Sequence, residues 1–191
     1  IPQGMQTLFN DFHHLQFIFI FLPIFFICYY AVPNGFKNTV LLTGSLCFYL
    51  IGALHNPEHF AIFLISIILD YAAAIKIQKT EKHKKLFLTA SIAFHIISLS
   101  VFKYAGFLIG EISRFVPSLD FAANIVLPIG ISFYTFQGLS YVIDVYNGKV
   151  KAEKSLLDFA VYIAMFEQLI AGPIVTYNQV EKELHARKIK A

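Results

Sequence analysis

The chain has 191 residues, of which 57% are hydrophobic and only 14% are charged, and its formal net charge is +3. Soluble domains carry about 45–50% apolar and about 25% charged residues, so a water-soluble globule of this length could not cover so much apolar surface. Lysine and arginine lie between the apolar runs, which is typical of membrane topology and not of a nucleic-acid-binding protein. Composition therefore predicts an all-α, polytopic transmembrane bundle whose main partner is the lipid bilayer.

Six apolar stretches approach the roughly 20 residues that a helix needs to cross about 30 Å of hydrocarbon. Nothing before Leu15 is positively charged, so the first stretch is interpreted as a retained span and not as a secretory signal. We expect five to six membrane segments within residues 15–177, preceded by an extracytoplasmic segment 1–14 and followed by a basic tail 178–191. Residues 1–4 precede Met5 and are interpreted as a cloning scar or upstream read-through. The six stretches are Leu15–Val32, Thr39–Leu54, Phe60–Ile75, Leu86–Phe102, Ile125–Ile143 and Leu156–Tyr177.

The basic residues between these stretches predict the orientation. The first connection has Lys37, the fifth has three lysines, and the third has five, from Lys76 to Lys85, whereas the second has none and the basic residues of the fourth are balanced by acidic ones. The positive-inside rule places these three connections in the cytoplasm and the N-terminus outside. A simple sixth crossing would leave the basic tail outside. Because Gly172 and Pro173 weaken a helix, we predict that the last stretch is broken or re-entrant, with these two residues as the candidate break.

Two short motifs are better explained by local structure than by catalysis. His55–His59 matches the H-x-x-E-H pattern of a class of zinc peptidases. Asn56 as N-cap, Pro57 as the first helical residue and Glu58 in the first turn explain the same residues as a helix start. Gly130–Tyr134 begins like a nucleophile elbow but has tyrosine where the second glycine belongs. We therefore expect neither a metal site nor a serine nucleophile.

Three ionisable residues are expected at membrane depth, where they are costly and so are functional candidates. Asp70 is six residues before the basic third connection, so it could instead reach the inner headgroups. His95 is expected near the midplane as a neutral ring bonded to a hydroxyl or carbonyl of a neighbouring helix, with a proton or substrate role as the alternative. The role of Glu167 stays open at this stage.

The segment Leu127–Tyr146 contains more polar residues than a lipid-facing helix can hold without partners, so it must face protein or a wet cavity. It also resembles the L-P-x-G-I-S-F-x-T-F-Q-x-x-S-Y-x-I-D-V-Y stretch of bacterial membrane-bound O-acyltransferases, in the branch of the alginate O-acetylation protein. Phe166–Val175 is similar to that branch's F-P-Q-L-I-A-G-P-I motif, with Glu167 in place of proline. Weaker matches extend the resemblance over most of Met5 to Leu184.

This resemblance implies a multi-pass enzyme of the bacterial inner membrane. It would move an acyl group, expected to be acetyl, onto a hydroxyl of an exported polysaccharide or cell-wall glycan. No cofactor is expected to be bound, and the acyl donor would be acyl-CoA or an acyl-carrier thioester. The expected partners are the donor or its carrier protein on the cytoplasmic side and the glycan or a partner transferase outside.

In the family the catalytic histidine lies downstream of the Q-L-I-A-G-P segment, at a position that the resemblance places beyond Ala191. The resemblance therefore implies an N-terminal portion without a catalytic residue of its own, inactive alone. Tyr134, Gln137 and Gln168 are the candidate tunnel-lining residues, as positioning groups and not as the base, although they could equally serve to tie helices together. Two alternatives stay open. One is D-alanyl transfer to teichoic acid by a member of the same family, and the other is a non-catalytic transport or scaffold subunit.

Overall fold

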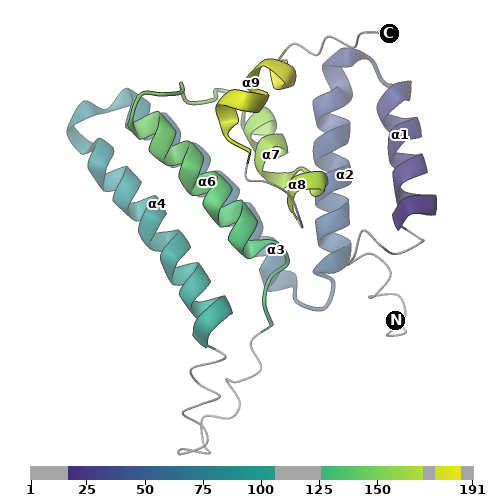
Figure 1. The fold of residues 1–191 in the computed structure, drawn as a ribbon, viewed down its shortest axis with the longest axis horizontal. Helices are drawn as coiled ribbons and strands as arrows, with labels where there is room; N and C mark the ends of the chain where they lie inside the picture. Colours follow the sequence, from purple (N-terminus) through teal and green to yellow (C-terminus); the bar gives the residue numbers. More distant parts are fainter. Residues whose placement is uncertain (1–16, 106–125, 170–174, 186–191) are drawn as a thin grey trace, which may run out of the picture.

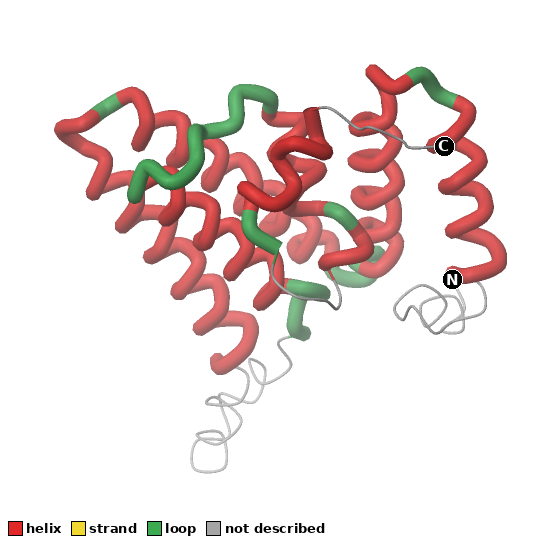
Figure 2. Tube along the Cα trace, turned by 45° about the horizontal axis from the view of Figure 1, so that its top comes forward, coloured by secondary structure: helices red, strands yellow, loops and turns green. Residues whose placement is uncertain are grey.

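The computed structural model describes residues 17–105, 126–169 and 175–185, and all regular structure within these ranges is helical (Figure 2). The predicted all-α class is therefore confirmed. Short 3-10 or π turns occur at Phe17–Phe21, Asn34–Phe36, Glu81–His83 and Ser100–Ala105. The α-helices are α1 (Leu22–Ala31), α2 (Lys37–Gly52), α3 (Pro57–Lys79), α4 (Lys84–Leu99), α6 (Ile131–Tyr146), α7 (Leu156–Ala164), α8 (Phe166–Leu169) and α9 (Tyr177–His185).

Two of the described helical segments are long and apolar enough to cross a membrane, Pro57–Lys79 and Glu81–Tyr104. They match the third and fourth predicted stretches. The apolar segment Phe17–Ala31 is shorter, and α2 and α6 have 16 residues each. At 1.5 Å per residue, 16 residues extend about 24 Å, which is less than the hydrocarbon thickness of about 30 Å.

Helix α3 is the centre of the bundle. It packs against α4 and α6, and also against α7 and α2, whereas α1 packs against α2 at one edge (Figure 1). Small buried residues on α3, Ser66, Ala73 and Ala74, allow its neighbours to approach closely. The α1 edge is held instead by a cluster of buried phenylalanines that includes Phe25 and Phe48.

Two helix starts test the local sequence signals. Helix α3 begins as predicted, with Asn56 at the N-cap, Pro57 first and Glu58 in the first turn, although the Asn56 side chain makes no capping hydrogen bond. Helix α6 begins at Ile131, later than the predicted Ile125. The delay has a local cause, because Gly130 has φ +69°, a conformation that ends regular helix on its N-terminal side.

The last apolar stretch is not one straight helix. Helix α7 has nine residues, about 13 Å of rise, and Met165 leaves helical geometry with ψ 115° before α8 begins. Glu153, which precedes α7, accepts hydrogen bonds from Tyr177 and His185 of α9. The chain therefore enters and leaves at the same end of the bundle. The described break is at Met165, and the predicted break at Gly172 and Pro173 lies outside the described residues, as do residues 1–14 and 186–191.

The first, third and fifth connections lie together at this end of the bundle, at the top of Figure 1. The amide N–H of Ala152 donates to Gln78 Oε1 at 3.0 Å, which joins the fifth connection to the end of α3. Asn38 Nδ2 donates to Asp158 Oδ1 at 2.6 Å and so joins the first connection to α7. This grouping agrees with the positive-inside prediction, while the side of the membrane stays a prediction.

Candidate functional site

Gln137, one of the predicted tunnel-lining residues, is buried in the middle of α6 and contacts the helix break. Its Nε2 donates to the Tyr162 carbonyl at 2.7 Å and, more weakly, to Gln168 Oε1 at 3.4 Å. The Tyr162 carbonyl is one of the last in α7, which have no partner within their own helix. Gln137 therefore provides a hydrogen-bond donor for a carbonyl at the end of α7, and the same amide group contacts Gln168 of α8.

Two other side chains form hydrogen bonds with polar backbone groups around this break. The Phe166 amide donates to Ser45 Oγ of α2 at 3.2 Å, and the Tyr162 hydroxyl donates to the Val175 carbonyl at 2.9 Å. Non-helical backbone at membrane depth is tolerated only where protein or water satisfies it. The sequence reasoning missed Ser45 and Tyr162, and a serine in the middle of an apolar stretch was the available signal.

Tyr134 has a different environment from the two glutamines. It lies one turn before Gln137 on α6 and is 2% exposed. Its ring centroid is 5.1 Å from that of Phe63, which in turn stacks on Tyr49 at 4.3 Å. The structure thus brings Gln137 and Gln168 together and places Tyr134 in the aromatic core. Their lining of a tunnel stays a prediction.

A second polar cluster joins α3 to α4 in the interior. Asp70 Oδ1 accepts from Ser91 Oγ at 2.7 Å, and His95 Nε2 lies 3.0 and 2.9 Å from the two Asp70 oxygens. All three residues are at most 2% exposed. Gly138 of α6 covers them, since a Cβ built there would lie 2.1 Å from Asp70 Oδ2.

This cluster corrects two expectations. Asp70 does not extend toward headgroups, because Ser91 and His95 hold it in the core. The partner of His95 on the neighbouring helix is a carboxylate and not a hydroxyl or carbonyl. The arrangement is also not a nucleophile relay, in which serine would contact histidine, because both contact the aspartate. Ser91 and His95 are four residues apart, so they share a helix face, and this was a usable signal.

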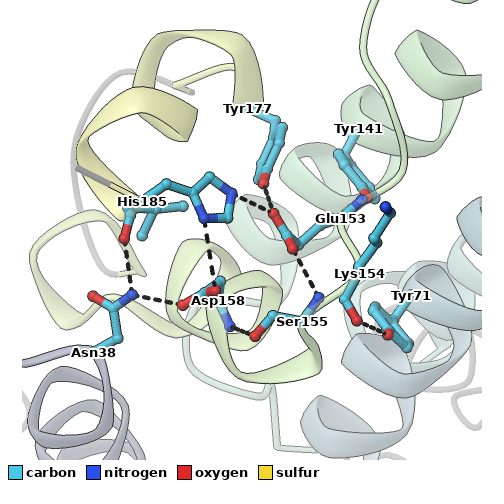
Figure 3. Close-up of polar contacts among 10 residues, drawn as sticks. Asn38, Tyr71, Tyr141, Glu153, Lys154, Ser155, Asp158, Tyr177 and His185 are labelled. Carbon is cyan, nitrogen blue, oxygen red and sulfur yellow. Dashed lines mark hydrogen bonds and ion pairs between the residues drawn. The ribbon is translucent and has the colours of Figure 1, made fainter. Parts of the chain in front are cut away.

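A third cluster fastens α9 to the loop before α7 (Figure 3). The buried carboxylate of Glu153 accepts from the Tyr177 hydroxyl, from His185 Nε2 at 2.8 Å and from the Ser155 amide at 2.7 Å. The Glu153 amide in turn donates to the Tyr141 hydroxyl at 2.7 Å. Sequence reasoning gave Glu153 no role because its partners are 2 to 32 residues away and lie in three different segments.

Burial alone would raise the pKa of Glu153, but donation from Tyr177, Ser155 and His185 outweighs it, so its pKa lies below the ordinary glutamate value. The carboxylate is therefore ionised at neutral pH and acts as an acceptor for all its donors. The Glu153 cluster therefore has a structural role, because it holds α9 against the loop before α7. Gln137 and Gln168 offer only amide groups to a ligand. Amides can orient a substrate but cannot serve as a general base.

Comparisons with known proteins agree with the motif resemblance. The chain is 34% identical over 182 residues to the protein named probable alginate O-acetylase AlgI of Azotobacter vinelandii, covering 90% of this chain and 35% of that protein. The corresponding protein of Pseudomonas aeruginosa is 32% identical over 178 residues, with 90% and 34% covered. A peptidoglycan O-acetyltransferase of Helicobacter pylori is 29% identical over 195 residues, with 86% and 36% covered. No protein-family model matches the chain, and no solved structure matches it significantly.

The long apolar helices and these relatives together indicate a membrane protein, and its described parts are helical. The chain belongs to the membrane-bound O-acyltransferase family, in the branch of the alginate O-acetylases. It spans about a third of the length of the curated relatives that it matches. The place that the resemblance gives to the catalytic histidine stays a prediction.

Proposed function

We propose that this chain is part of a multi-pass enzyme of the bacterial cytoplasmic membrane that transfers acetyl groups to hydroxyls of an exported polysaccharide or cell-wall glycan. The similarity to the Azotobacter vinelandii protein, 34% over 90% of the chain, carries this proposal. Because the chain spans about a third of its relatives, the activity is proposed for a protein of the relatives' length.

In this proposal the chain contributes five to six membrane segments, the last of them re-entrant, and a path between a thioester donor in the cytoplasm and an acceptor outside. Gln137 and Gln168, which meet at the break after α7, orient a reactant there. The general base is a histidine supplied by a part of the protein other than residues 1–191, as the family resemblance implies.

The names of these relatives favour acetyl over D-alanyl transfer, since alginate O-acetylase and peptidoglycan O-acetyltransferase both describe O-acetyl transfer. They also favour an enzyme over a transport or scaffold subunit. Deleting the gene that encodes this chain tests all three functions. Acetate and D-alanine released by mild alkali from the exported polysaccharide and cell wall would be measured. We expect acetate to fall and to return with the wild-type gene, while D-alanine stays unchanged.

Loss of D-alanine with acetate intact would overturn the acetyl proposal in favour of the alternative acyl group. Loss of neither would overturn the enzymatic proposal. The chain of 191 residues alone, reconstituted in vesicles, is expected to transfer no acetyl group from acetyl-coenzyme A to alginate or peptidoglycan fragments. Measurable transfer would contradict the proposal that the base is supplied from elsewhere.

A further inference from the structure

Glu167 is an exposed carboxyl group halfway along the bundle. It is the second residue of α8, next to Phe166, whose amide donates to Ser45 Oγ. Ser45 is the ninth of the sixteen residues of α2, so α8 lies at the mid-height of that helix. In the membrane arrangement proposed above, Glu167 is therefore in the hydrocarbon region.

The Glu167 side chain faces an apolar groove of about 240 Å³ between α1, α2, α8 and α9. Phe25, Phe26 and Tyr29 of α1 form one wall, and Leu41 of α2 and Met165 form part of the other. Among the described residues that line this groove, Glu167 is the one that carries a charge. The groove therefore combines long apolar walls with a single acidic group.

No hydrogen bond or ion pair joins Glu167 to another residue in the described parts of the chain. An ionised carboxylate at membrane depth is costly unless it is paired, and such residues mark functional contacts. The interior of this chain shows the usual solution, in which a buried acid has donors: Asp70 is bonded to Ser91 and His95. Glu167 needs an equivalent donor, and the groove in front of it has room for one.

We propose that this groove seats a lysine or arginine side chain from a membrane helix of a partner protein. The aliphatic stem of such a side chain packs against the apolar walls while its charged head pairs with Glu167. A lipid acyl chain would fit the walls but would leave the carboxylate unpaired, and an anionic ligand would be repelled by it. The family motif has proline at this position. A carboxylate here therefore favours a contact with a partner particular to this protein over a contact shared by the whole family.

The test uses the chain in phosphatidylcholine vesicles with synthetic poly-leucine membrane helices as probes. One probe carries a single central lysine, and the control probe carries leucine there. Association is measured by energy transfer between labelled chain and probe. We expect the lysine probe to bind about tenfold more tightly than the leucine probe, which is the scale of one charge-assisted contact within a membrane.

Glu167→Gln should remove this preference, whereas Glu58→Gln, an exposed glutamate at the start of α3, should keep it. Leu41→Trp fills the groove without touching the charge and should also block the lysine probe, which guards against a folding defect in one variant. Equal binding of both probes by a chain that stays in the vesicles would overturn this inference alone. Release of the chain by alkaline carbonate would overturn the proposed membrane arrangement as well. If a protein of the relatives' length that contains this chain cannot bind the lysine probe, a helix of that protein fills the groove, which would overturn the assignment to a partner.

Discussion

Replacing Gly138 by alanine should break the polar cluster that joins α3 to α4. The new Cβ would lie 2.1 Å from Asp70 Oδ2, whereas ordinary contact requires at least 3.4 Å. The carboxylate must therefore retreat by about 1.3 Å, as the difference between these two distances shows. Hydrogen bonds of 2.7 to 3.0 Å to Ser91 and His95 cannot survive a displacement of that size.

The expected loss of stability follows from the bonds that are broken. Hydrogen bonds between membrane helices average about 0.6 kcal/mol, so the two donors to Asp70, the Ser91 hydroxyl and the His95 Nε2 shared between both carboxyl oxygens, contribute about 1 kcal/mol. Leaving a buried carboxylate without donors adds to this, and breaking a buried pair costs up to about 3–5 kcal/mol. We therefore expect Gly138→Ala to lower the free energy of unfolding by about 2 to 4 kcal/mol.

Unfolding of the chain in mixed micelles, titrated with dodecyl sulfate and followed by circular dichroism, measures this change. Gly35→Ala is the matched control, because a Cβ at Gly35 has no neighbour within 4 Å. The decisive measurement repeats Gly138→Ala in an Asp70→Ala background, where the clash is gone and the substitution should cost little. An equal cost in both backgrounds would refute the reasoning.

Two further predictions concern the other clusters. Gln137→Leu removes the donor to the Tyr162 carbonyl and should destabilise the chain by about 1 to 3 kcal/mol, measured by the same unfolding titration; an unchanged midpoint would mean that this bond contributes nothing. The pKa of Glu153 is lower in the folded chain than its usual value of 4.5, so its contribution is complete above about pH 4.5 and is lost as pH falls through the folded pKa. Stability measured from about pH 6 to about pH 3 should therefore fall, and Glu153→Gln should flatten this fall; a profile as steep as that of the wild type would contradict the assignment.

Apolar periodicity and punctuation predicted the helical class, the start of α3 and the broken last stretch. These features depend on residues close together in the sequence, such as Asn56, Pro57 and Glu58. The grouping of the basic connections at one end also followed from sequence, because alternation of loops across a membrane is a simple geometric rule. The break itself was placed later than Met165, since no breaking residue marks that position.

The polar clusters were less accessible to sequence reasoning. Asp70 and His95 were singled out one by one, but their pairing depends on how α3 packs against α4 under Gly138. Glu153 acquires its role only when α9 returns to the loop before α7. Contacts between residues far apart in the chain depend on packing angles and registers, which composition and spacing do not determine.

The central structural feature of the chain is that its last apolar stretch returns to the end of the bundle where it starts. The most direct test is to measure on which side of the membrane α9 lies. Single cysteines at Lys149→Cys, Lys182→Cys and Glu58→Cys would be introduced after replacing Cys28 and Cys47 by alanine. An impermeant maleimide would then be applied to sealed vesicles of known orientation. Positions 149 and 182 should react from the same side, and position 58 from the opposite side. Reaction of positions 149 and 182 from opposite sides would contradict the return and require a complete crossing between them.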